Sequence, residues 1–111
     1  MRRDYTHVKD ITQAVIKALD VPASALTQRV FNIGSGSMHS AAQVAEAVRA
    51  VIPNADIAIG MGLSDLEQND MRARGMLDLS AARQQLRYEP QYTLEAGIWD
   101  YVEMFRAAND L

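Results

Sequence analysis

The stretch Arg29-Val-Phe-Asn-Ile-Gly-Ser-Gly-Ser-Met-His-Ser40 decides how this chain is organised. It has the pattern of a short apolar strand, a glycine loop and the capped start of a helix. Such a loop can bring a backbone close to a pyrophosphate at a helix N-terminus. However, His39 stands where the third glycine of a G-x-G-x-x-G motif belongs, and no acidic residue closes a second strand about 20 residues later. We therefore interpret the loop as a structural turn.

The residues before this stretch predict a strand and a helix. Residues 3–8 have the β-branched and aromatic content of a short strand, and apolar residues then recur at helical spacing from about residue 8 to 19. His7 stands at the cap position of that helix. A carboxylate in the first turn, Asp10, favours the exposed amides of the helix start. Residues 20–28 form a polar connection.

The following residues predict a second helix between two further strands. Residues 30–33 are the apolar strand of the opening stretch. Ser40 and Gln43 form a capping box for a helix that Pro53 ends, and residues 56–60 alternate like a third strand.

Residues 61–75 interrupt this regular pattern, because they are polar, contain glycine and carry charges of both signs. An irregular stretch of this length in a small domain is usually a functional loop or disordered, so we expect it to contact a ligand. Asp78 then caps a helix through Leu86, and Thr93 caps the last helix. The inward stripe of that last helix comprises Leu94, Ile98, Tyr101, Val102 and Phe105, with Trp99 at its edge. The pattern predicts a single α/β domain over residues 1–111, a small mixed fold of about three short strands and four helices.

Composition excludes several functional classes. A net charge of −3 argues against a nucleic-acid binder, which would normally carry a basic face. The chain has no cysteine, which excludes disulfides and thiol chemistry. No apolar run approaches the roughly 18 residues needed to cross a bilayer, and the N-terminus lacks the apolar segment of a signal peptide. We expect a cytoplasmic protein with no membrane or nucleic-acid partner.

The sequence offers weak candidates for catalysis. Tyr5 and Lys9 match Tyr-x-x-x-Lys, a pair that transfers protons when both groups share one helix face. Tyr5 precedes the expected helix, so we do not expect the two to act together. Neither His7 nor His39 has a metal-ligating partner at helical spacing. We therefore assign no catalytic, cofactor-binding or metal-binding residue.

The remaining candidates are Arg3, Asp70, Arg72 and Arg74. Guanidinium groups suit phosphate oxygens, and a carboxylate suits a sugar hydroxyl. The alternative is that these four are ordinary solvated surface charges.

Five segments resemble landmarks of the extended short-chain dehydrogenases, the NAD-dependent epimerase/dehydratase family that includes UDP-glucose 4-epimerase. In chain order they are Arg3-Asp-Tyr-Thr-His-Val-Lys-Asp-Ile11, Phe31-Asn-Ile-Gly-Ser-Gly36, Asp78-Leu-Ser-Ala-Ala82, Leu86-x-Tyr-x-Pro90 and Leu94-Glu-Ala-Gly97. The resemblance covers only the substrate-binding, C-terminal third of such an enzyme. It implies that the N-terminal dinucleotide-binding domain, with the catalytic Tyr-x-x-x-Lys, is absent here.

The resemblance also implies a function. Family members oxidise a nucleotide-linked sugar with bound NAD and then epimerise, dehydrate or reduce it. We expect NAD in the full-length parent and none in this chain, which alone should be inactive. Arg3 matches the family arginine that contacts the substrate diphosphate, and Asp70 is similar to the aspartate that holds the ribose.

The sequence departs from the family pattern at two positions. Glu67 stands where an arginine is expected three residues before Asp70, so Arg72 or Arg74 would replace it. Arg87 stands where the family has a helix-ending glycine. A left-handed Arg87 should cost about 1 kcal/mol relative to glycine.

An alternative hypothesis is a non-catalytic α/β fragment. Without a neighbouring sheet, the strand at residues 30–33 would have open edges, and open edges recruit other chains. On this hypothesis we expect a homo-oligomer.

Overall fold

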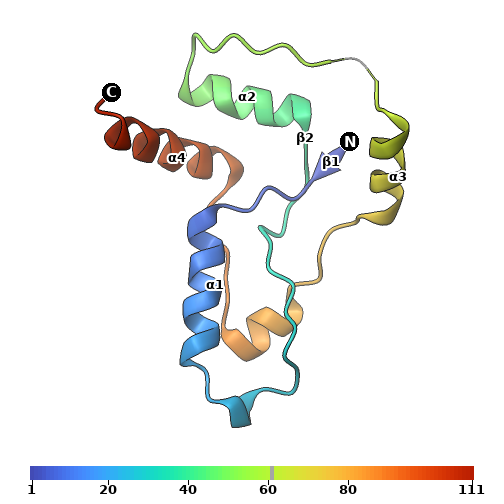
Figure 1. The fold of residues 1–111 in the computed structure, drawn as a ribbon, viewed down its shortest axis with the longest axis vertical. Coiled ribbons are helices and arrows are strands. Elements are labelled where there is room, and N and C mark those ends of the chain that lie inside the picture. Colours follow the sequence, from blue (N-terminus) through green and yellow to red (C-terminus); the bar gives the residue numbers. More distant parts are fainter. Residues whose placement is uncertain (61) are drawn as a thin grey trace.

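The computed structural model describes residues 1–60 and 62–111, and Figure 1 shows their arrangement. Its elements in chain order are β1 (Arg2–Arg3), α1 (Val8–Asp20), the 3₁₀ turn η1 (Ala23–Ala25), β2 (His39–Ser40), α2 (Ala41–Val51), α3 (Asp65–Ala73), the π-helical turn η2 (Ala82–Leu86) and α4 (Leu94–Ala108). The fold is therefore small and mixed, as predicted, with less strand than the sequence suggested.

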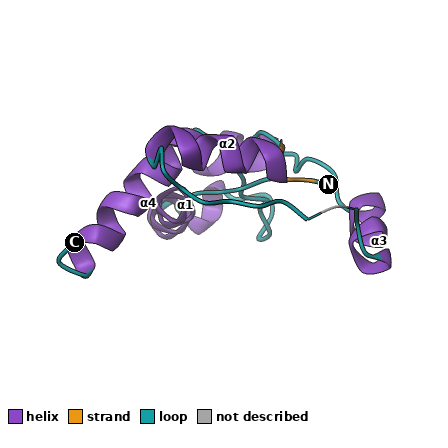
Figure 2. Cartoon of the chain, turned by 90° about the horizontal axis from the view of Figure 1, so that it is seen from above, coloured by secondary structure: helices purple, strands orange, loops and turns teal. Residues whose placement is uncertain are grey.

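The molecule is thin and open. Its principal extents are 51 × 40 × 18 Å, and its radius of gyration is 16.7 Å, against about 13 Å for a compact domain of this length. Figure 2 shows α2 and α4 packed together, as they are in Figure 1, with α3 at the far end. No helix among residues 1–60 and 62–111 is long and apolar enough to cross a membrane.

The sheet is much smaller than predicted. β1 pairs with β2 in antiparallel register, Arg2 opposite Ser40 and Arg3 opposite His39. The expected strand at residues 3–8 is reduced to its first positions. The expected strands at 30–33 and 56–60 are wrong, because neither segment has a strand partner in the described part of the chain.

The core lies between α1 and η2. Its buried residues are Ala14, Leu79, Ala82, Leu86 and Tyr88, and Phe31 and Ile33 pack against them. Val30 is exposed by contrast, so the residues at 30–33 still alternate as a strand would. The apolar pattern therefore gave the correct facing of this segment and the wrong hydrogen bonding.

The helix predictions were mostly right. α1 begins after His7, and α2 has the predicted capping box, in which Ser40 accepts from the Gln43 amide. α4 begins after Thr93, whose side chain accepts from the Ala96 amide. Asp78 accepts from the Ser80 amide at 2.9 Å, and the helical turn that follows ends at Leu86 as predicted.

The prediction that residues 61–75 are irregular is wrong for the larger part of that stretch, although Met61 lies outside the described residues. Residues 65–73 form α3, and Ser64 and Glu67 make a reciprocal capping box at its start. This box satisfies backbone donors that a short polar helix would otherwise expose to water alone.

The predicted stripe of α4 is only partly inward. α4 packs against α2, where Leu94, Ile98 and Val102 are half-buried. Tyr101 and Phe105 remain exposed, at 61% and 52%. The periodicity identified the apolar face correctly, but this chain supplies a partner for only part of it.

Arg87 adopts the left-handed conformation, with φ 56° and ψ 33°. Replacing it by glycine is expected to raise the free energy of unfolding by about 1 kcal/mol, because glycine has no Cβ to strain there. Lys17 binds the carbonyl oxygen of Arg87, not its side chain, so this contact persists in the variant. Urea denaturation measures the change. Arg87→Ala is the control, and equal stability of the two variants would contradict the backbone explanation.

Candidate functional site

Three of the four predicted site residues meet between β1 and α3. Arg3, on β1, donates from Nη2 to Oδ2 of Asp70 at 3.0 Å. Arg74, the C-cap residue of α3, forms an ion pair with the same carboxylate, with its Nε 2.6 Å from Oδ1. One carboxylate therefore joins two guanidinium groups from segments about 70 residues apart.

These residues line a pocket of about 390 Å³. Its charged members are Arg2, Arg3, Asp4, Asp70 and Arg74, which leave one net positive charge. The apolar part of its lining includes Met1, Met38, Met71, Met76 and Leu77. Cationic forks beside flexible thioether chains suit a ligand with an anionic part and an apolar or aromatic part.

Arg72 does not join this group. It lies two residues from Asp70 on α3, and a helix places residues two apart on different faces. Its side chain is exposed and is not among the residues that line the pocket. Of the two arginines proposed to replace the one missing at Glu67, only Arg74 lies at the site.

The glycine loop is held by side chains instead of a ligand. The Ser35 amide donates to both oxygens of Asp4, at 2.9 and 3.0 Å, and the buried Tyr88 hydroxyl donates to the carbonyl oxygen of Gly34 at 2.6 Å. Burial, with a further effect of Asp10 and Asp4, raises the pKa of Tyr88 to about 12. The carboxylate beside the loop amide would repel a pyrophosphate, so these residues do not fit one.

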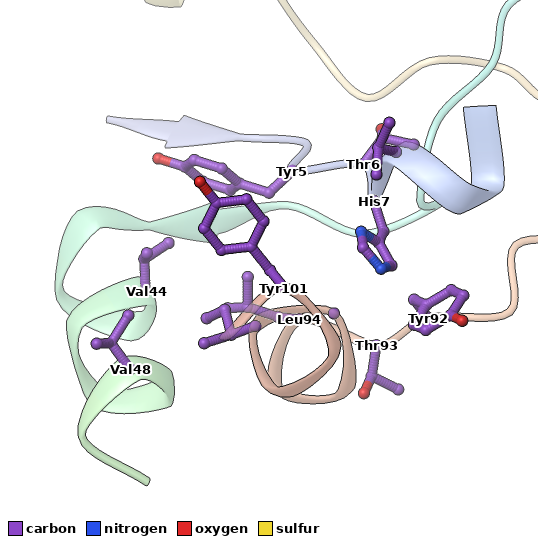
Figure 3. Close-up of a pocket in the computed structure, with 12 residues that line it drawn as sticks. Tyr5, Thr6, His7, Val44, Val48, Tyr92, Thr93, Leu94 and Tyr101 are labelled. Atoms are coloured by element: carbon purple, nitrogen blue, oxygen red, sulfur yellow. The ribbon is translucent and has the colours of Figure 1, made fainter. Parts of the chain in front are cut away.

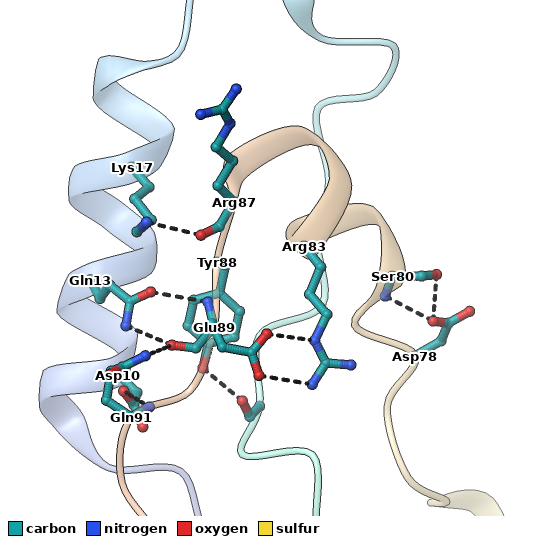
Figure 4. Close-up of polar contacts among 11 residues, drawn as sticks. Asp10, Gln13, Lys17, Asp78, Ser80, Arg83, Arg87, Tyr88, Glu89 and Gln91 are labelled. Carbon is teal, nitrogen blue, oxygen red and sulfur yellow. Dashed lines mark hydrogen bonds and ion pairs between the residues drawn. The ribbon is translucent and has the colours of Figure 1, made fainter.

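Figure 4 shows how this region is tied to α1. Both oxygens of the buried Asp10 accept backbone N–H groups, from Gln91 at 2.8 Å and Tyr92 at 3.2 Å. Gln13 exchanges two hydrogen bonds with the Glu89 backbone. Asp10 lies in the first turn of α1, as predicted, but its carboxylate hydrogen-bonds the amides of a distant segment instead of those of its own helix.

A second hollow of about 310 Å³ lies among α2, α4 and the residues before α1 (Figure 3). Tyr5, His7, Val48 and Tyr101 are part of its lining, which includes no lysine, arginine or carboxylate. It therefore lacks the cations that a phosphate-bearing ligand needs, and it is the weaker candidate for such a ligand.

His7 and Lys9 both bind Asp100 beside that hollow. His7 Nε2 lies 2.8 Å from Oδ2, and Lys9 Nζ donates to Oδ1 at 2.8 Å. These contacts, with that to Lys9 the largest, hold the pKa of Asp100 below its ordinary value, and the same bond raises the pKa of Lys9. Lys9 thus pairs with α4 and not with Tyr5. Within the described ranges no group of three or more histidines and carboxylates could hold a metal ion.

No family model and no curated protein matches the chain. Solved structures do. An L-threonine dehydrogenase from Clostridium difficile is 22% identical with a TM-score of 0.76, over 96% of this chain and 33% of that one. A partial-consensus L-threonine 3-dehydrogenase is 27% identical with a TM-score of 0.74, over 96% and 34%.

A dTDP-glucose 4,6-dehydratase from Bacillus anthracis, solved in complex with NAD, is 22% identical with a TM-score of 0.68, over 98% of this chain and 32% of that one. The chain thus spans about a third of each matched structure. These likenesses support the resemblance to extended short-chain dehydrogenases at the level of fold, and they do not single out UDP-glucose 4-epimerase.

Proposed function

We propose that this chain is the substrate-binding portion of an NAD-dependent extended short-chain dehydrogenase that acts on a nucleotide sugar. The observation that carries the proposal is the meeting of Arg3 and Arg74 at Asp70, in a pocket that includes the two residues, Arg3 and Asp70, that the sequence resemblance assigns to substrate. Arg3 and Arg74 bind the diphosphate, and the methionine-lined part of the pocket receives the nucleoside.

The size and charge of the pocket favour this assignment. Sites for ligands of drug size occupy about 300 to 1,000 Å³, and the pocket volume of about 390 Å³ lies within this range. Arg3 uses one nitrogen and Arg74 uses Nε for Asp70, which leaves further N–H groups of both forks for phosphate oxygens.

NAD would belong to a different part of the parent enzyme. The glycine loop does not fit its pyrophosphate, because Asp4 already accepts the Ser35 amide and adds a negative charge there. We therefore propose that the chain alone neither binds NAD nor turns over substrate.

Calorimetric titration of the chain tests the proposal, with UDP-, GDP- and dTDP-sugars, NAD and L-threonine as separate ligands. Binding of a nucleotide sugar is expected. Arg3→Ala should weaken that binding about tenfold or more, since charge-assisted hydrogen bonds contribute about 1.5–3 kcal/mol. Arg72→Ala, a matched loss of one cation, should change it little.

Two results would contradict this function. Tight NAD binding would show that a cofactor site exists in this chain. Binding of L-threonine without any nucleotide sugar would favour a threonine dehydrogenase instead, which two of the matched structures are.

A second candidate is a self-associating, non-catalytic fragment. The observation that favours it is the exposed apolar face of α1, where Val8, Val15, Ile16 and Leu19 are each more than half exposed. Contiguous exposed apolar side chains mark surfaces that bind other chains. Light scattering distinguishes the candidates: a stable dimer without ligand binding supports this one, and a monomer at high concentration excludes it.

A further inference from the structure

Asp70 is a carboxylate that two of the three arginines lining the pocket, Arg3 and Arg74, share. Its Oδ2 accepts a hydrogen bond from Arg3 and its Oδ1 forms an ion pair with Arg74, so each oxygen already has a cationic partner. Each oxygen keeps a second lone pair, so a ribose hydroxyl could bind Asp70 only beside a guanidinium that is already in place. Both contacts of Asp70 pair opposite charges, so the two arginines are its principal partners.

The two arginines have little else to hold them at the pocket. Their side chains are 40% and 68% exposed, and each would lose considerable rotamer freedom on binding a ligand. Two guanidinium groups that line one pocket also repel each other. A carboxylate between them offsets the repulsion and restricts both side chains before any ligand arrives.

We propose that Asp70 is a positioning residue that holds Arg3 and Arg74 together as a two-arginine fork for a diphosphate. The inference rests on the proposed function for the identity of the pocket. It assigns Asp70 a role opposite to the one its charge suggests, because the carboxylate assists the binding of an anion.

This role predicts that removing the negative charge of Asp70 weakens the binding of an anion. If Asp70 were only a nearby negative charge, its neutralisation would strengthen the binding of an anion. If it holds the fork, Asp70→Asn should weaken the binding, because the two guanidinium groups then repel each other and move independently.

Inorganic pyrophosphate is the probe, titrated calorimetrically into the 111-residue chain. We expect Asp70→Asn to weaken its binding about tenfold, the cost of one mis-set charge-assisted contact. Asp65→Asn removes the same charge from the first turn of α3, away from the pocket lining, and should leave binding equal or slightly tighter. Asp70→Glu should restore much of the affinity.

Two further measurements separate positioning from folding. Far-ultraviolet circular dichroism should give the same helicity for the Asp70 variants as for the unmodified chain. The Arg74 Nε–H resonance should move toward that of a free guanidinium in Asp70→Asn and not in Asp65→Asn.

Each result of the pyrophosphate titration either supports or overturns the role proposed for Asp70. Pyrophosphate binding by Asp70→Asn as tight as that of the unmodified chain, or tighter, overturns the inference, as does failure of the unmodified chain to bind pyrophosphate. If pyrophosphate binds with the expected variant pattern but no nucleotide sugar binds, the fork stands and the proposed function fails.

Discussion

Replacing Asp10 by alanine is expected to lower the free energy of unfolding by about 3 kcal/mol, because it leaves two polar partners unsatisfied and each such loss costs about 1–3 kcal/mol. The Asp10 side chain is almost completely buried, and its two oxygens accept the amides of Gln91 and Tyr92. Alanine would leave both of these part-buried amides without this acceptor. The segment that joins η2 to α4 would lose its attachment to α1.

Urea denaturation followed by circular dichroism measures the effect. Asp10→Asn should lose less, because its one carbonyl oxygen can still accept one of the two amides. Asp20→Asn is the matched control, since Asp20 is an exposed carboxylate at the other end of the same helix. If Asp10→Ala proved as stable as Asp20→Asn, these hydrogen bonds would contribute nothing net.

The sequence was sufficient to predict structure where that structure depends on residues close together in the chain. The Ser40–Gln43 capping box and the Thr93 cap specify helix starts through contacts three residues apart, and both are present. The same signal was available at Ser64 and Glu67, where it begins α3. The glycines and mixed charges around this helix obscure the cap, because they are also typical of an irregular loop.

The sequence was insufficient where structure depends on distant partners. Residues 30–33 have strand-like alternation, but a strand also needs a neighbour to receive its hydrogen bonds. Nothing near Asp10 reveals that its acceptors will serve amides some 80 residues away. Periodicity reports which face of a segment is apolar, and it does not report whether the chain supplies something to cover it.

The candidate site also has a part that the sequence predicts and a part that depends on how distant segments fold. The family resemblance pointed to Arg3 and Asp70, and these two form an ion pair. It could not choose between Arg72 and Arg74, because that choice depends on how α3 is turned. Once residues 65–73 are helical, Arg74 lies one turn from Asp70 and Arg72 does not.

Replacing Gly34 by alanine is expected to destabilise the protein by about 2 kcal/mol, as overpacking in a tight site typically does. Gly34 is buried, and an added Cβ would lie 2.6 Å from Oδ2 of Asp4. Asp4 cannot withdraw freely, since its carboxylate accepts the Ser35 amide and the Thr6 hydroxyl. The cost therefore comes from a steric conflict at a side chain that is already engaged.

Gly60→Ala is the matched control, because an added Cβ there meets nothing within 4 Å and should leave stability nearly unchanged. Thermal denaturation of both variants gives the comparison, and equal melting temperatures would contradict the conflict at Asp4. The expected damage extends beyond the loop. Asp4 follows Arg3 directly, so a displaced Asp4 should also weaken pyrophosphate binding in Gly34→Ala and leave it intact in Gly60→Ala. A loss of stability without a loss of binding would mean that the glycine loop and the arginine fork are independent.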